Sequence, residues 1–95
     1  MDFCKVIEEL YETIQKRKAE MPEDSYTASL FKKGEDKILQ KVGEEAVEVI
    51  LAFKSGKKED IVYEISDLIY HLTVAMVDKG VTFEDISSEL KRRMR

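Results

Sequence analysis

The chain contains very few residues that interrupt a helix. Its 95 residues include one proline, Pro22, and four glycines, at positions 34, 43, 56 and 80. Proline and glycine are the residues least favourable in the interior of a helix. No stretch of the sequence keeps the alternation of apolar and polar residues that is typical of a strand. The sequence therefore predicts an all-α fold.

The helix-breaking residues divide the chain into a small number of helical segments. The predicted segments are helices at residues 2–20, 35–54 and 59–79, a loop at 25–33 that can contain a short helix, and a last helix towards Met94. Residues 21–24 end the first helix, and Gly34 stops the short segment. Thr82, with Asp85 three residues later, forms a capping-box variant that starts the last helix. We expect a single domain of four to five helices over residues 1–95.

A chain of this length has a small core of its own. It buries only a little over ~60% of the surface of its unfolded state. With 43% hydrophobic and 38% charged residues it is nevertheless globular and not disordered. Around the predicted helix 59–79, Ile65, Ile69 and Met76 widen the apolar arc beyond the usual ~100° stripe. We therefore expect a helical bundle that is completed by a second subunit, in a homodimer or higher homo-oligomer.

Several classes of partner and location are excluded. No apolar run approaches the ~20 residues of a membrane span. The amino end lacks the pattern of a secretory signal, and the single cysteine, Cys4, fits a reducing compartment, so we expect a cytoplasmic protein. A net charge of −4 and scattered basic residues argue against a nucleic-acid partner.

Two acidic pairs with the same spacing lie in the two long predicted helices. Glu45 and Glu48 are three residues apart, and so are Glu64 and Asp67. On a helix, residues at this spacing are surface neighbours with Cβ atoms about 5–6 Å apart. Two such helices facing each other would therefore place four carboxylates in one volume.

Apolar residues border both acidic stripes. At ~100° per residue, each acidic pair lies on one lengthwise stripe of its helix. The apolar residues beside these stripes are Ile38, Val42, Val49 and Phe53 on one helix and Ile61, Leu68, Leu72 and Ala75 on the other. Lys41 shares the stripe of Glu45 and Glu48, but one lysine cannot neutralise four carboxylates. Crowded carboxylates without a counter-ion are costly or become protonated. The pattern favours a cation site, while solvated surface acids stay open as the alternative.

The chemistry of such a site follows from its ligands. Ligation by oxygen alone suits Mg²⁺, with Mn²⁺ as a possible substitute, and Mg²⁺ is usually shared between carboxylates and substrate phosphates. Lysines upstream of the acids, at positions 32, 33, 37 and 41, fit a polyphosphate substrate. One more carboxylate, such as Glu44, can take the proton from an attacking water.

A redox di-metal site in a helical bundle fits poorly. Such sites take a Glu-x-x-His motif from each of two helices. The one histidine of the chain, His71, comes four residues after Asp67. We interpret it as a satisfied residue of the bundle or as a hydrogen-bond donor behind the metal ligands.

Three segments carry a resemblance to a known family. Glu-Glu-Ala-Val-Glu at 44–48, followed after fifteen residues by Glu-Ile-Ser-Asp at 64–67, resembles the EExxE…ExxD signature of MazG-type all-α nucleotide pyrophosphohydrolases. With Ser-Tyr-Thr-Ala-Ser-Leu at 25–30, Lys-Val-Gly at 41–43 and Leu-Ile-Tyr-His at 68–71, the chain resembles the phosphoribosyl-ATP pyrophosphohydrolase family more closely. The similarity covers residues 3–93.

The resemblance implies a role for each matching residue. The implied Mg²⁺ ligands are Glu45, Glu48, Glu64 and Asp67. Glu44 matches a further acid near the metal, and we assign it as the catalytic base or as a ligand of a second metal. The positions implied near the substrate are Ser25, Tyr26, Thr27, Lys37 and Lys41.

The resemblance also implies a reaction. It would be the Mg²⁺-dependent hydrolysis of the α–β phosphoanhydride of 1-(5-phosphoribosyl)-ATP to phosphoribosyl-AMP and pyrophosphate, the second step of histidine biosynthesis. Members of the family are dimers, and some are fused to the next enzyme of the pathway; this chain is expected to be a stand-alone form. Two alternatives stay open: a house-cleaning nucleoside triphosphate pyrophosphatase of the same superfamily, and a non-catalytic helical interaction bundle.

Overall fold

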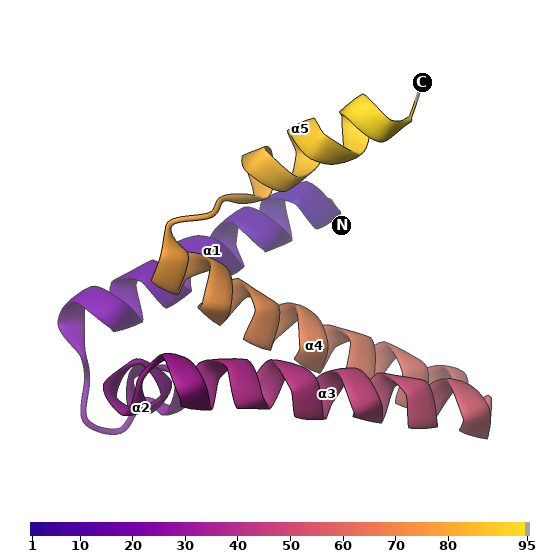
Figure 1. Cartoon of the computed structure of the whole chain (residues 1–95), viewed down its shortest axis with the longest axis horizontal. Helices are drawn as coiled ribbons and strands as arrows, with labels where there is room; N and C mark the ends of the chain where they lie inside the picture. Colours follow the sequence, from indigo (N-terminus) through magenta and orange to yellow (C-terminus); the bar gives the residue numbers. More distant parts are fainter. Residues whose placement is uncertain (95) are drawn as a thin grey trace.

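The computed structural model describes residues 1–94, which form five α-helices and no strand (Figure 1). The helices are α1 (Phe3–Glu20), α2 (Tyr26–Lys33), α3 (Glu35–Ser55), α4 (Lys58–Lys79) and α5 (Phe83–Arg93). The prediction of an all-α fold is confirmed. The segment 25–33 is a helix over most of its length, and the other boundaries agree with the predicted ones to within one or two residues.

Side chains at the first residues of the helices explain where three of them begin. The Asp2 carboxylate accepts a hydrogen bond from the backbone N–H of Cys4 (2.9 Å) and caps α1. Ser25 Oγ accepts from the N–H of Ala28 (3.0 Å) and caps α2. At α5 the predicted capping box of Thr82 and Asp85 is present with both of its hydrogen bonds. Each of these bonds satisfies a backbone donor that the first turn of a helix leaves free.

The long helices α3 and α4 lie side by side and run in opposite directions (Figure 1). Gly56, with φ of 75°, ends α3 in the left-handed conformation that suits glycine and lets the chain reverse over a short turn. α1 packs across α4, and α2 packs against both α1 and α3. The antiparallel pair is the element on which the acidic segments meet.

The core lies at one end of the α3–α4 pair, where α1 and α2 cover it. Its buried members come from all four of these helices and are Ile14, Leu30, Ile38, Val74 and Val77. On α1 only part of the predicted apolar face is buried: Ile7 and Ile14 are buried, whereas Phe3 and Val6 are exposed. The reason is that α1 crosses α4 at an angle, so its first turn extends past the core (Figure 1).

Helix α5 is attached mainly through its first turn. The Tyr11 hydroxyl donates to the carbonyl of Val81 (2.8 Å), and the Tyr11 ring meets the ring of Phe83 edge-on at 6.0 Å. No residue of α5 within the described range is buried.

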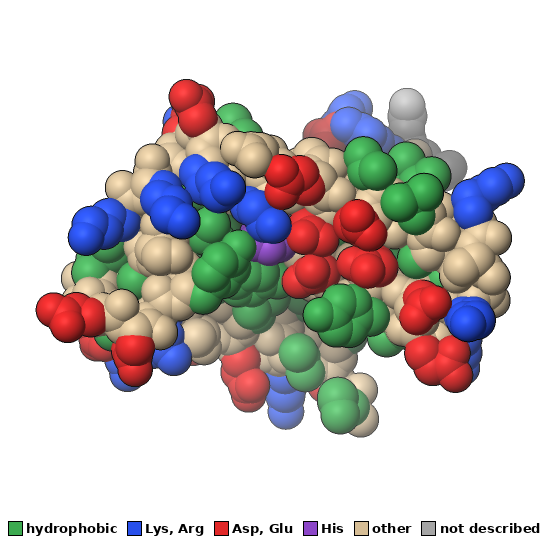
Figure 2. All heavy atoms as spheres, turned by 90° about the horizontal axis from the view of Figure 1, so that it is seen from below, with side chains coloured by type: hydrophobic (Ala, Val, Ile, Leu, Met, Phe, Trp, Pro, Cys, Tyr) green, Lys and Arg blue, Asp and Glu red, His purple; other side chains and the backbone are tan. Residues whose placement is uncertain are grey.

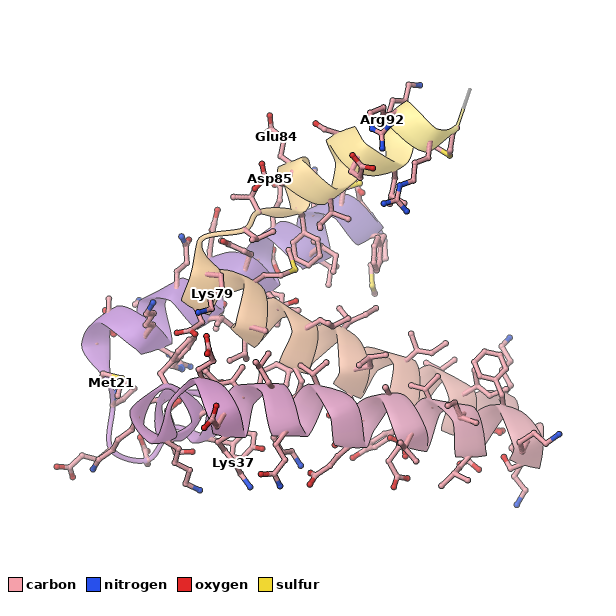
Figure 3. All side chains as sticks on the ribbon, in the orientation of Figure 1. Met21, Lys37, Lys79, Glu84, Asp85 and Arg92 are labelled. Atoms are coloured by element: carbon pink, nitrogen blue, oxygen red, sulfur yellow. The ribbon has the colours of Figure 1, made fainter. Side chains whose placement is uncertain are left out.

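An ion pair also joins the end of α4 to the start of α3. It is formed by Lys79, labelled at the end of α4 in Figure 3, and Glu35.

Among residues 1–94, none of the helices is both long enough and apolar enough to cross a membrane.

Candidate metal centre

Three carboxylates meet where α3 faces α4. Glu45 of α3 and Glu64 and Asp67 of α4 each place one oxygen so that the three atoms lie within 4.8 Å of one another. The antiparallel pairing of the helices brings them together although 18 residues lie between Glu45 and Glu64 in the chain. Glu45 is only 8% exposed, and the other two are partly buried. We call these three residues the carboxylate cluster.

Burial and mutual repulsion disfavour the charged state of this cluster. Burial raises the pKa of Glu45, and the charge of Asp67 raises it further, while Lys41 opposes the change. Burial also raises the pKa of Glu64, and the charges of Glu48 and Asp67 add to it. Three acid groups that repel one another in a confined, all-oxygen site have the chemistry that a hard divalent cation prefers. The residues present therefore fit such an ion.

Glu48, the fourth predicted ligand, lies at the edge of the cluster. Its side chain is exposed, and its oxygens are not among the three that converge within 4.8 Å. Its charge is nevertheless the largest cause, after burial, of the raised pKa of Glu64. Glu48 is thus near enough to act on the charge of Glu64, although its oxygens lie outside the converging group.

Lys41 and Glu44 form an ion pair beside the cluster. The Lys41 ammonium is 3.4 Å from a Glu44 oxygen and 3.6 Å from a Glu45 oxygen. Glu44 also accepts a hydrogen bond from the Gln40 side chain (2.8 Å). The pKa of Glu44 is lowered, first by the hydrogen bond from Gln40 and then by Lys41. Glu44 therefore stands outside the carboxylate cluster as an exposed, ionised acid.

The predicted substrate residues at the start of α2 lie next to the carboxylate cluster because they contact α4. The hydroxyls of Thr27 and Tyr70 are 2.5 Å apart, which ties the first turn of α2 to α4. The Tyr26 ring, 53% exposed, lies 6.4 Å from the Tyr70 ring and 6.1 Å from the His71 ring. Ser25 acts as the cap of α2. The start of α2 and the acidic turn of α4 are thus parts of one surface.

Basic side chains adjoin the acids on this surface. Figure 2 shows a row of lysine or arginine side chains that leads to the acidic group, with the single histidine between them. Lys37 points away from α4, on the outer side of α3 (Figure 3). It is close enough to Glu44 to contribute to the lowered pKa of that acid. A substrate that bears several negative charges can contact the cluster and these lysines together.

The sequence pattern assigns no site role to Tyr70, and for His71 it predicts a satisfied residue of the bundle or a hydrogen-bond donor behind the metal ligands. The four-residue spacing from Asp67 to His71 puts both on one face of α4, and this spacing was the available signal for His71. Tyr70 is placed by a partner 43 residues away in the chain, which no local pattern reveals.

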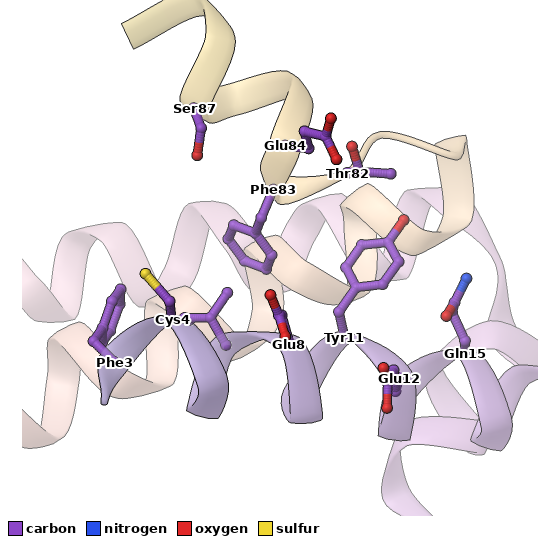
Figure 4. Close-up of a pocket in the computed structure, with 11 residues that line it drawn as sticks. Phe3, Cys4, Glu8, Tyr11, Glu12, Gln15, Thr82, Phe83, Glu84 and Ser87 are labelled. Atoms are coloured by element: carbon purple, nitrogen blue, oxygen red, sulfur yellow. The ribbon is translucent and has the colours of Figure 1, made fainter. Parts of the chain in front are cut away.

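A groove elsewhere on the molecule is less suited to an anion. A groove of about 530 Å³ lies between α1 and the start of α5, with Phe3, Tyr11 and Phe83 in its walls (Figure 4). Its charged side chains are Glu8, Glu12 and Glu84, and no lysine or arginine is among its described lining residues. This groove is therefore less suited to a polyphosphate than the surface around Lys41 and the carboxylate cluster.

Comparison with known proteins gives matches over nearly the whole chain. The family model described as phosphoribosyl-ATP pyrophosphohydrolase matches residues 7–94. The chain is 54% identical over 95 residues to a phosphoribosyl-ATP pyrophosphatase of Clostridium novyi, covering 100% of this chain and 86% of the relative. A relative of the same name from Leptospira biflexa is 50% identical over 93 residues, with 98% of both chains covered.

A third relative is a longer protein. The chain is 54% identical over 94 residues to the histidine biosynthesis bifunctional protein HisIE of Caldanaerobacter subterraneus. The match covers 99% of this chain but 46% of that protein, so the chain spans about half the length of this relative.

We expect Glu45→Gln to stabilise the protein in the absence of metal, because it removes a buried charge that faces Asp67. A gain of ~1 kcal/mol would raise the melting temperature by about 4–8 °C in a domain of this size. The same variant should lose most of the stabilisation that Mg²⁺ or Mn²⁺ gives to the native protein. Calorimetry with and without each cation measures both effects.

Glu9→Gln, which changes an exposed acid of α1, is the matched control and should behave as the unmodified chain. A lower melting temperature without metal, or full stabilisation by cations, would contradict the expectation.

Proposed function

The chain belongs to the phosphoribosyl-ATP pyrophosphohydrolase family, and from this premise we propose that it hydrolyses the α–β phosphoanhydride of 1-(5-phosphoribosyl)-ATP. The products would be phosphoribosyl-AMP and pyrophosphate, in the second step of histidine biosynthesis. The observation that carries the proposal is the carboxylate cluster of Glu45, Glu64 and Asp67, within 4.8 Å, beside Lys41. Relatives that bear the name of this activity are 50% and 54% identical over nearly all of the chain.

The carboxylate cluster would hold Mg²⁺, with Mn²⁺ as a substitute, and Glu48 would complete the ligand set from the edge. When bound, the cation neutralises negative charge on the phosphates and lowers the cost of charge that develops during hydrolysis. The raised pKa of Glu45 supports this assignment, since its first causes are burial and the charge of Asp67. A bound cation directly offsets the repulsion between Glu45 and Asp67.

The other charged side chains would bind the phosphate oxygens and accept the proton of the attacking water. Lys41, held 3.4 Å from Glu44, and the nearby Lys37 supply positive charge to phosphate oxygens that extend beyond the cluster. Glu44 would accept the proton of the attacking water, or act as ligand of a second cation. Its lowered pKa keeps it ionised near neutral pH, which is the state that accepts a proton. To do so it must exchange its bond to Gln40 for one to water.

The first turn of α2 would contact the nucleoside part of the substrate. The exposed ring of Tyr26 offers a flat surface against which a base can stack. Thr27 is fixed by its hydrogen bond to Tyr70, and Ser25 holds the start of the helix in place. These contacts keep the turn at a constant position relative to the carboxylate cluster.

The activity is tested by the release of pyrophosphate from phosphoribosyl-ATP in the presence of Mg²⁺. Asp67→Asn should lower kcat/KM by at least about 100-fold, because even residues behind the ligands of a metal site cost about 10–100-fold when changed. Glu59→Gln, an exposed acid in the first turn of α4, is the matched control and should retain activity.

The two alternatives give different results in this experiment. Hydrolysis of ordinary nucleoside triphosphates in place of phosphoribosyl-ATP would replace the proposal with a house-cleaning pyrophosphatase. A protein whose melting temperature does not rise with Mg²⁺ would instead be a non-catalytic bundle, since a ligand bound only to the native state must stabilise it.

We also propose that the chain forms a homodimer through α3 and α4. Both helices expose large apolar side chains away from the core, namely Val47, Ile50, Leu51, Phe53, Val62 and Tyr63. Figure 2 shows hydrophobic side chains at the surface around the acidic group. A monomer of this size rarely leaves so many large apolar residues together in water, and a second copy would cover them.

A charge introduced into this apolar surface should separate the subunits. Ile50→Lys is expected to shift the species in size-exclusion chromatography with light scattering from dimer to monomer, because the interface would have to bury the ammonium group. Thr13→Lys adds the same charge on an exposed position of α1 and should leave the dimer intact. A monomeric unmodified chain, or an Ile50→Lys variant that stays dimeric, would contradict the proposal.

A further inference from the structure

His71 is buried without the hydrogen bonds that a buried imidazole normally has. The side chain is 3% exposed, and its Nδ1 atom is fully enclosed with no hydrogen-bond partner in the described part of the chain. Of the two predictions for His71, the satisfied residue of the bundle is therefore wrong, while the hydrogen-bond donor behind the metal ligands stays a prediction. A buried polar atom without a partner is rare and calls for an explanation.

The enclosed Nδ1 indicates where the proton of a neutral ring resides. A neutral imidazole carries one N–H donor and one acceptor nitrogen. If the proton were on Nδ1, the structure would bury a donor without an acceptor. The less costly arrangement leaves Nδ1 as a bare acceptor and puts the proton on Nε2. Burial also lowers the pKa of His71, although Asp67 opposes this, and the neutral form is favoured.

Nε2 differs from Nδ1 in its surroundings. It has no hydrogen-bond partner among residues 1–94 either, yet it is not enclosed as Nδ1 is. The single histidine of the chain reaches the surface between the acidic group and the basic side chains (Figure 2). The charged groups that act on it are Asp67, Lys41 and Glu44. The rings of Tyr70, at 4.8 Å, and Tyr26, at 6.1 Å, enclose its other sides.

We propose that His71 is a substrate-binding residue whose Nε2–H donates a hydrogen bond to a phosphate oxygen of the nucleotide. The proposal rests on the proposed function, which supplies the polyphosphate. In this position the ring adds a neutral donor near both Lys41 and the carboxylate cluster. A neutral donor orients an anionic oxygen without adding to the charge that the lysines already provide.

A role confined to holding the metal ligands does not account for the ring. Among the described residues, Asp67 forms no hydrogen bond with His71. If the ring served only to hold α4 in position, its Nδ1 atom would be expected to have a hydrogen-bond partner. An apolar side chain would also fill the space without an enclosed, unpaired nitrogen. A bound group that accepts a hydrogen bond from Nε2 explains why a polar ring stands at this point.

The first test is the imidazole ¹⁵N spectrum of the metal-free chain near neutral pH. The chain has one histidine, so both ring signals belong to His71, and their couplings to the two ring C–H protons distinguish Nε2 from Nδ1. We expect a neutral ring with its proton on Nε2. Magnesium pyrophosphate, added until calorimetry shows binding, should shift the Nε2 signal more than the Nδ1 signal. A proton on Nδ1, or bound pyrophosphate without a change at Nε2, would overturn the proposal.

The second test uses three substitutions that separate the two ring positions. Glutamine places an amide N–H near the position of Nε2, asparagine places it near Nδ1, and methionine removes the donor. His71→Met and His71→Asn should lower kcat/KM for phosphoribosyl-ATP by roughly 10- to 100-fold, as expected for a hydrogen bond to a charged group. His71→Gln should recover a large part of the loss.

Stability and metal binding distinguish this role from a structural one. His71→Met should melt at or above the temperature of the unmodified chain, since an enclosed unpaired nitrogen is removed. Its affinity for Mn²⁺ alone, measured by calorimetry, should be unchanged. Thr73→Val, which removes a different buried polar group of α4, is the matched control and should retain activity.

Opposite results would refute the proposal. They are equal losses for glutamine and methionine, full activity of the methionine variant, or weakened Mn²⁺ binding. If the unmodified chain did not cleave phosphoribosyl-ATP, the proposed function would fail, whereas the pyrophosphate-induced shift at Nε2 would still decide the role of His71.

Discussion

The packing of α3 against α4 brings like charges together inside a small protein. The antiparallel pair places Glu45 opposite Glu64 and Asp67, with oxygens within 4.8 Å of one another. Burial of Glu45 makes this arrangement unfavourable without a counter-ion. The same helices also carry Lys41 and the ring of His71 beside the acids. The site is therefore a property of the helix pair, and the rest of the chain fixes how the pair is arranged.

The core stabilises this arrangement from one end only. Ile38 of α3 and Val74 of α4 belong to the enclosed cluster that α1 and α2 complete. Beyond the carboxylate cluster, the same two helices expose apolar residues such as Ile50 and Val62. Hydrophobic burial thus holds the pair together on one side of the acids, and on the other side a second subunit would provide it. The repulsion between the carboxylates is tolerated because the packing beside it is favourable.

The fold could be predicted because its signals are local. Caps such as Thr82 with Asp85, and the glycine at position 56, mark helix ends through bonds within a few residues. The acidic pairs were likewise visible as i, i+3 neighbours. The sequence could not show which acid of each pair faces the other helix. Glu45 is buried and Glu48 is exposed, because the crossing of α3 and α4 decides which carboxylate of α3 faces α4. The surroundings of His71 depend on the same crossing and on the Tyr26 ring of α2.

The claim on which this account depends is that the carboxylate cluster holds a divalent cation. Anomalous diffraction from crystals grown with Mn²⁺ locates such an ion directly. We expect a peak between α3 and α4, within bonding distance of Glu45, Glu64 and Asp67. A peak bound by other side chains, with these three carboxylates free of metal, would contradict it.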